Sequence, residues 1–106
     1  MTTLEASAGY LTLINTFTVE PERAEALLAV LSKATDSIRL MPGFVSANLH
    51  VSRDRRHVAN YAQWRSQEDL EAMLNSAEAQ PHLREAAAIA SGFNPILYDL
   101  RETHSP

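Results

Sequence analysis

The chain has 106 residues, 45% of them hydrophobic and 21% charged, which is an ordinary composition for one folded domain. Nine Lys and Arg stand against 13 Asp and Glu, and the resulting net charge of -4 argues against binding to nucleic acid. The absence of cysteine excludes disulfides, thiolate catalysis and cysteine-ligated metal centres.

Residues 1–9 lack the basic start and apolar run of a signal peptide, and no stretch is long and apolar enough to suggest a membrane span. We therefore expect a cytoplasmic protein that has no membrane partner. The sequence predicts a single domain over residues 1–106, with its core at about residues 10–100 and short flexible tails.

Residues 10–19 predict the first strand, because apolar and threonine side chains alternate along them. Asn15 falls on the apolar face of this strand. Glu20 and Pro21 open a helix in which apolar side chains recur at helical spacing, and the Met-Pro-Gly at residues 41–43 ends it.

Residues 44–52 and 58–64 alternate again and predict a β-hairpin, whose turn at residues 53–57 holds the one basic cluster of the sequence. Ser66 and the acidic residues after it have the pattern of a helix N-terminal cap. The helix that follows carries an apolar stripe of Leu70, Met73, Leu74 and Ala77.

A break at Gln80 and Pro81 leads to a further helical segment over residues 82–90. Gly92 is interpreted as the end of this helix and residues 96–100 as a short last strand. The element order indicates an α+β fold of the ferredoxin-like βαββαβ type. Two helices cover one face of such a sheet, and the other, bare face predicts a homodimer, the arrangement of a dimeric α/β-barrel.

Strand periodicity places Asn60 and Trp64 on one strand face, together with Val58 and Ala62. Buried polar groups without partners are costly, so either the fold or a ligand must pair these two side chains. Asn15 adds a second amide on an apolar strand face. Two amides and one indole among apolar side chains are typical of a small-molecule site, which predicts a pocket between the sheet and its helices.

Three segments of the chain carry a family resemblance. They are Asn15-Thr-Phe-Thr-Val, Met-Pro-Gly43-Phe44 and Asn60-Tyr-Ala-Gln-Trp64-Arg-Ser. These segments resemble the antibiotic biosynthesis monooxygenase family, and the resemblance extends from about Tyr10 to Asp99. The combination of Asn15, Asn60 and Trp64 is similar to that of the quinone-forming monooxygenases of aromatic polyketide pathways. Those enzymes oxidise anthrone-like substrates with dioxygen and use neither metal nor flavin, so the resemblance implies no cofactor.

The resemblance implies that Asn15, Asn60 and Trp64 are catalytic and that they hold and polarise the substrate. Donors aimed at the oxygen of an anthrone or phenol favour its resonance-stabilised anion, as an oxyanion hole does. This anion passes one electron to dioxygen, recombines as a peroxide and loses water to give a quinone. The expected partners are therefore a small aromatic, polyphenolic substrate and dioxygen.

His50 and Arg84 resemble polar pocket residues of the polyketide-oxidising members, which implies that both bind substrate. His50 lies in strand phase with Phe44, and an imidazole that titrates near neutral pH is a candidate proton acceptor. The competing interpretations are a solvent-facing strand histidine and a helix-surface arginine.

Phe17, Leu70 and Met73 are expected to shape the pocket and to contact the substrate. The packing of these side chains, together with the break at residues 80–81, sets the pocket volume. Leu70 stands where polyketide-oxidising relatives have a tyrosine, so tyrosine-assisted protonation is not expected in this chain.

The same superfamily contains haem-degrading enzymes, which the chain resembles at Asn15 and, as a candidate axial ligand, at His82. Those enzymes carry a tryptophan in the helix where this chain has Met73. The four histidines form no metal-spaced pair, and no metal site is predicted. A non-catalytic small-molecule-binding barrel is another alternative, as is an isomerase or cyclase with His50 or His82 as its base.

Overall fold

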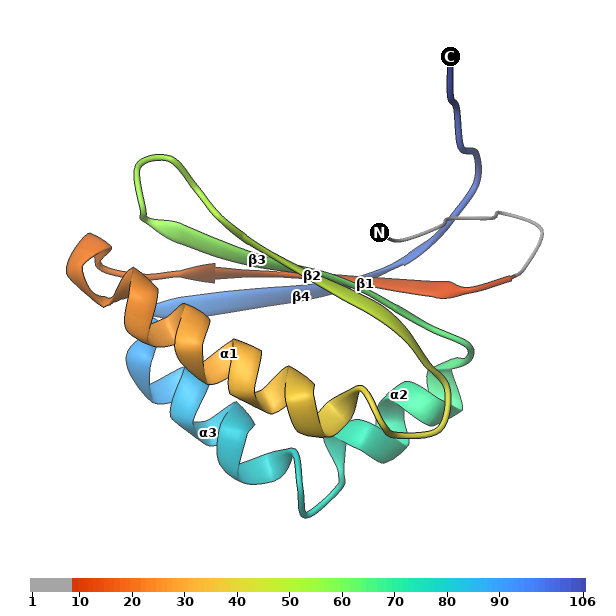
Figure 1. The fold of residues 1–106 in the computed structure, drawn as a ribbon, viewed down its shortest axis with the longest axis horizontal. Coiled ribbons are helices and arrows are strands. Elements are labelled where there is room, and N and C mark those ends of the chain that lie inside the picture. Colours follow the sequence, from red (N-terminus) through yellow and green to blue (C-terminus); the bar gives the residue numbers. More distant parts are fainter. Residues whose placement is uncertain (1–8) are drawn as a thin grey trace.

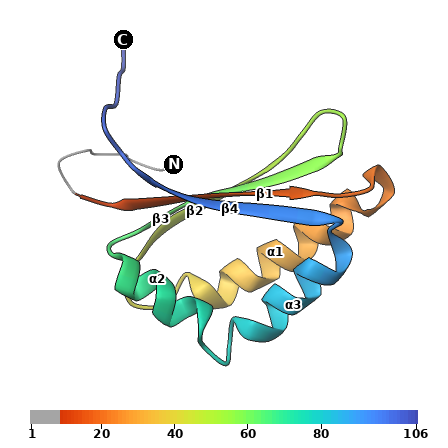
Figure 2. The same cartoon turned by 180° about the vertical axis from the view of Figure 1, so that it is seen from behind.

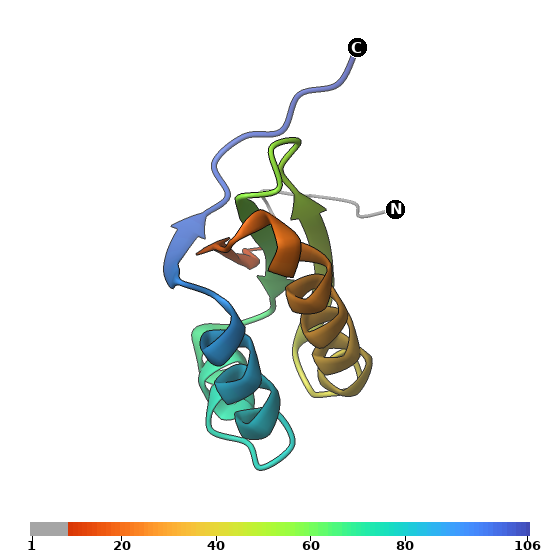
Figure 3. The ribbon, with the colours of Figure 1, turned by 90° about the vertical axis from the view of Figure 1, so that its left-hand side faces the viewer.

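The structure is a computed structural model that describes residues 9–106. Four strands form one antiparallel sheet in the order β2-β3-β1-β4, and the helices lie together on one side of it (Figures 1 and 2). Viewed along the helices, the molecule has two layers (Figure 3). The predicted ferredoxin-like arrangement is confirmed, whereas the predicted flexible N-terminal tail lies outside the described residues.

The first strand and helix follow the sequence pattern closely. Strand β1 spans Leu11–Thr18, and a short 3-10 turn, η2 at Pro21–Arg23, leads into helix α1 at Ala24–Ile38. Proline is favoured in such a first turn because its missing N–H has no helical partner there. Helix α1 turns one apolar stripe toward the sheet, formed by Ala24, Leu27, Leu31, Ala34 and Ile38.

The predicted hairpin consists of β2 at Phe44–Val51 and β3 at His57–Trp64. Its turn is held by Asp54, whose carboxylate accepts hydrogen bonds from the Ser52 hydroxyl at 2.6 Å and from the Arg56 backbone N–H at 3.0 Å. These two hydrogen bonds lower the pKa of the exposed Asp54 carboxyl. The charged turn is therefore explained by local structure.

Helix α2 spans Gln67–Leu74 and α3 spans Gln80–Ile89. The predicted cap is confirmed, because the Ser66 hydroxyl accepts from the backbone N–H of Asp69 at 3.1 Å. The predicted break at residues 80–81 is wrong, since α3 begins there and tolerates Pro81 in its first turn. The break lies before α3. There the Ser76 hydroxyl donates a hydrogen bond to the Met73 carbonyl at 2.7 Å and accepts one from the Ala79 N–H at 3.1 Å.

The last strand, β4, spans Gly92–Asp99 and starts four residues before the predicted position at Ile96. Gly92 belongs to the strand and does not end the helix, because Ala90 already has an extended backbone. Pro95 lies inside this strand. An edge strand accepts proline because one side of it has no ladder partner, and β4 is an edge strand of the sheet.

The core between sheet and helices consists of two apolar clusters at opposite ends of α1. The first contains Phe17, Val19, Ala24, Leu27, Leu31, Val58 and Ala86. The second contains Ala34, Ile38, Trp64, Leu70, Met73 and Ala79. Burying these side chains provides the main driving force for docking the helices on the sheet.

Within residues 9–106, no helix covers the other face of the sheet (Figures 1 and 2). The pairing registers place Ile14 beside Tyr61 and Ile96 on this open face, with Tyr98 two residues further along β4. Ile96 and Tyr98 are 40% and 44% exposed. The chain end after β4 leaves the sheet on this same side (Figure 1).

Candidate active site

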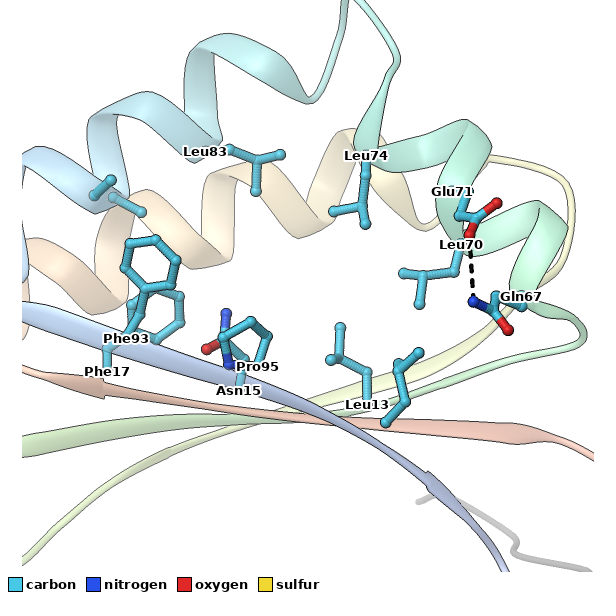
Figure 4. A pocket seen from close by; sticks show the side chains of 13 residues that line it. Leu13, Asn15, Phe17, Gln67, Leu70, Glu71, Leu74, Leu83, Phe93 and Pro95 are labelled. Atoms are coloured by element: carbon cyan, nitrogen blue, oxygen red, sulfur yellow. Dashed lines mark hydrogen bonds between the residues drawn. The ribbon is translucent and has the colours of Figure 1, made fainter.

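A cavity of about 430 Å³ lies between the helical layer and strands β1 and β4 (Figure 4). Its volume is in the usual range for small-molecule sites. It is almost entirely apolar, and its residues come from β1, α2, α3 and β4. They are Leu13, Asn15, Phe17, Gln67, Leu70, Glu71, Leu74, Leu83, Ala86, Ala87, Phe93, Pro95 and Leu97.

Asn15 provides a polar group on the β1 floor of this cavity, between Phe17 and Leu13 (Figure 4). Its Oδ1 atom is buried and has no hydrogen-bond partner among residues 9–106. A buried amide oxygen without a partner costs roughly 1 to 3 kcal/mol. Because Asn15 lines the cavity, this oxygen is available to a ligand that enters it.

Asn60 lies directly across the β1–β3 ladder from Asn15, so the two side chains leave the sheet side by side on the helix-facing side. The Oδ1 atom of Asn60 is also buried and unpartnered within the described chain. Asn60 does not itself line the cavity. The structure therefore places the two predicted amides side by side. Asn15 lines the cavity, and Asn60 lies next to it on β3.

Trp64 lies four residues after Asn60 on the same strand face and is 1% exposed in the second apolar cluster. Its ring meets that of Phe44 edge to face, with 5.5 Å between the ring centroids. Trp64 shares this cluster with Leu70 and Leu13, which line the cavity, but it does not line the cavity itself. It supports the wall of the cavity from behind.

The predicted pocket-shaping residues divide into two groups. Phe17 and Leu70 line the cavity, whereas Met73 is buried in the second apolar cluster behind it. Arg84 is exposed on α3 and His82 is partly exposed near the start of that helix, and neither lines the cavity.

His50 lies on the opposite, open face of the sheet and is exposed. The prediction that it shares a face with Phe44 is wrong, because a bulge between Phe44 and Ser46 shifts the register of β2. Phe44 therefore packs on Trp64, while His50 is paired with Ala59 on the other side. The extra residue of a bulge is not visible in the alternation of the sequence.

Sequence reasoning missed the wall formed by β4. Phe93, Pro95 and Leu97 all line the cavity, and Phe93 approaches Phe17 with 6.1 Å between ring centroids. The alternating apolar residues at 93, 95 and 97 carry the signal of a strand, but Pro95 in their middle masks it. Gln67 and Glu71 of α2 were also missed as cavity residues.

Among residues 9–106, no group of three or more His, Asp or Glu side chains is placed to hold a metal ion. Within the same range, no helix is long and apolar enough to cross a membrane. The polar side chains that line the cavity are Asn15, Gln67 and Glu71, and its other lining residues are apolar.

The sequence model of the antibiotic biosynthesis monooxygenase family matches residues 10–88. The chain belongs to this family. Tetracenomycin-F1 monooxygenase of Streptomyces glaucescens is 43% identical over 106 residues, covering 99% of the chain and 92% of that enzyme. The family prediction is thus confirmed by a near full-length relative, and with it the prediction of a monooxygenase.

Solved structures of the same family share the fold. A monooxygenase from the gene ActVA-Orf6 of Streptomyces coelicolor, in complex with Nanaomycin D, is 26% identical, with a TM-score of 0.81 over 97% of this chain and 99% of that one. SnoaB, a cofactor-independent oxygenase from Streptomyces nogalater, is 24% identical, with a TM-score of 0.82 over 90% of this chain and 96% of that one. The ferredoxin-like monooxygenase fold therefore extends over nearly the whole chain.

Proposed function

We propose that the chain oxidises an anthrone-like, polyphenolic polyketide to a quinone with dioxygen, and that neither metal nor flavin takes part. The substrate class is supported by the relative named for tetracenomycin F1 and by the Nanaomycin D complex. The observation that carries the proposal is the pair of adjacent amides with buried, unpartnered oxygens, of which Asn15 lines the apolar cavity and Asn60 lies beside it.

The reaction begins with loss of a proton from the carbon opposite the anthrone carbonyl. The electron pair left behind is shared with the carbonyl oxygen, and amide N–H groups of Asn15 and Asn60 stabilise that oxyanion. Within residues 9–106 neither amide is committed to another hydrogen bond, so both are free to reorganise around the substrate. The surrounding apolar walls strengthen these hydrogen bonds by excluding water.

The anion then transfers one electron to dioxygen, and the resulting substrate radical and superoxide combine into a carbon-bound peroxide anion. This anion takes up a proton, which replaces the one lost in the first step, and becomes a hydroperoxide. Loss of the second hydrogen from that carbon, with cleavage of the O–O bond, releases water and leaves a carbonyl. One substrate and one dioxygen thus give one quinone and one water. The two electrons taken from each C–H bond reduce the dioxygen, so no external reductant is needed.

Trp64 is proposed to act from behind the cavity wall by fixing Leu70 and Leu13, and its N–H is a further donor if the substrate reaches it. His50 and Arg84, exposed in the monomer, would act on the substrate only where a second copy or a substrate extension meets them. The haem-degrading alternative has no such support, because His82 does not line the cavity.

We also propose that two copies pair through the open sheet faces to form the dimeric barrel. Ile14, Tyr61, Ile96 and Tyr98 form a continuous, partly exposed apolar surface there. An apolar sheet face of this kind is commonly covered by a second copy of the same chain.

Dioxygen consumption by metal-free and flavin-free protein supplied with a tricyclic anthrone tests the activity. We expect quinone formation by the wild type, and kcat/KM on the order of a hundredfold lower in Asn15→Ala and Asn60→Ala. Trp64→Phe is expected to lose activity as well. Ser37→Ala is the control, because Ser37 is an exposed polar residue of α1 that lies neither in the cavity nor on the open face. Uptake no faster than the spontaneous reaction would reject the proposal.

A further inference from the structure

The cavity has a second polar region that the proposed reaction does not use. Apart from Asn15, the only polar side chains among its lining residues are Gln67 and Glu71, which lie at its α2 end (Figure 4). Leu13 and Leu70 lie between this end and Asn15 in the same view. A ligand that contacts Asn15 therefore presents a different part of its surface to Gln67 and Glu71.

Helix α2 positions the two side chains by its own periodicity. Gln67, Leu70, Glu71 and Leu74 are spaced three and four residues apart, so they share one helix face, and that face lines the cavity. The Ser66 cap fixes where the helix begins. The polar pair is thus built on a regular element and is not the end of a loose loop.

The hydrogen bonds of the pair define what it can accept. Gln67 Nε2 donates to Glu71 Oε1 at 3.2 Å, which orients both side chains. Glu71 Oε2 and Gln67 Oε1 have no hydrogen-bond partner among residues 9–106, and no cation in that range forms an ion pair with Glu71. This end of the cavity is therefore rich in acceptors and carries a negative charge.

We propose that the Gln67–Glu71 pair selects substrates with a hydroxyl on the outer ring and rejects those with a carboxylate there. A phenolic hydroxyl donates a charge-assisted hydrogen bond to Glu71, whereas a carboxylate meets a like charge and two acceptors. This inference rests on the proposed function, because it assumes a polycyclic aromatic ligand with its reacting carbonyl at Asn15.

The competing explanation is that the pair only supports the helix, as exposed glutamine and glutamate four residues apart commonly do. The two explanations predict different results for ligands. A helix-supporting pair affects all ligands equally through the stability of α2, whereas a selective pair changes the ranking of ligands that differ in one substituent.

The test uses anaerobic calorimetric titration of three matched anthrones: the unsubstituted tricycle, the same with one outer-ring hydroxyl, and the same with one outer-ring carboxylate. We expect the wild type to bind the hydroxyl compound roughly tenfold more tightly than the unsubstituted one, and the carboxylate least tightly. Glu71→Gln is expected to reduce the preference for the hydroxyl, because a neutral acceptor replaces a charged one, and to improve carboxylate binding. The affinity for the unsubstituted compound is expected to change least. Glu68→Gln, an exposed carboxylate of α2 outside the cavity, is the matched control.

An equal change of all three dissociation constants in Glu71→Gln, or no change in their ranking, would overturn the inference. The absence of any binding by the wild type would overturn it as well. Since these titrations contain no dioxygen, they are independent of turnover. Selective binding in the titrations without oxygen uptake in the activity assay would reject the proposed reaction and support the selectivity of Gln67 and Glu71. Oxygen uptake, together with a ranking of the three ligands that Glu71→Gln does not change, would support the reaction and reject the selectivity.

Discussion

Asn15 and Asn60 occupy strand positions that face the core, where strand propensity and burial both favour an apolar side chain. The fold leaves both amide oxygens without partners, which is a cost to the empty protein. Polar side chains that lie at a cavity and lower the stability of the fold are typical of a binding site. This relation between stability and function leads to a prediction for Asn15.

Asn15→Leu is expected to raise the free energy of unfolding by about 1 kcal/mol while abolishing quinone formation, because it removes the unpaired oxygen and the donor together. Urea denaturation followed by circular dichroism measures the first quantity and the oxygen electrode the second. A variant that is both less stable and inactive would indicate that Asn15 serves the fold.

At the scale of single residues, the alternation of β1 and β3 was sufficient to predict that the two amides face the helices. It was not sufficient for His50, because the bulge at the start of β2 moves every later side chain of that strand to the other face. In the sequence, Gln67 and Glu71 look like ordinary polar residues on a helix surface. Only the tertiary structure shows that their face of α2 lines the cavity.

At the scale of elements, the join between α1 and β2 depends on Gly43. Its φ of 85° lies in the left-handed region, and a Cβ placed there would overlap the carboxylate of Asp69. The Gly43 carbonyl also accepts the backbone N–H of Arg65 at 2.8 Å, which ties this turn to the end of β3. The turn thus holds the α2 wall of the cavity against the sheet.

Gly43→Ala is expected to lower the free energy of unfolding by about 2 to 4 kcal/mol, since it combines backbone strain with an overlap. Gly92→Ala is the matched control, because a Cβ at Gly92 meets nothing within 4 Å, and we expect a change within about 0.5 kcal/mol. Thermal or urea denaturation of both variants provides the comparison. Similar losses in the two would show that Gly43 has no special role.

The helices and the first three strands could be predicted from periodicity and caps, because their apolar faces pack directly on one another. The fourth strand was placed too late and the gap between α2 and α3 was misplaced. Gly92 is interpreted as the end of the helix although it belongs to β4, and Pro81 as a break although it lies in the first turn of α3. The missed part of β4 is the part that forms the cavity wall.

Across the whole molecule, the two faces of the sheet carry different features. The helix-facing side carries the cavity, and the open side carries the apolar surface of Ile14, Tyr61, Ile96 and Tyr98. The single-domain organisation with a core near residues 10–100 stays a prediction, as does the cytoplasmic location.

The proposed dimer predicts that light scattering coupled to size-exclusion chromatography gives twice the mass of the 11.7 kDa chain. Ile96→Asp is expected to shift the protein to the monomer, because it places a charge in the middle of the apolar surface. Leu40→Asp is the control, since Leu40 is 83% exposed and lies outside the sheet. Dimers that persist in Ile96→Asp would place the interface elsewhere.

Stabilisation of the substrate anion by the paired amides can be observed in the anaerobic absorbance spectrum of bound anthrone. We expect the wild type to bind anthrone as its coloured anion at a pH where free anthrone is neutral. Asn15→Ala and Asn60→Ala are expected to bind it in the neutral form. A neutral spectrum of anthrone bound to the wild type, or an anion spectrum undiminished in both variants, would show that the amides do not stabilise the anion.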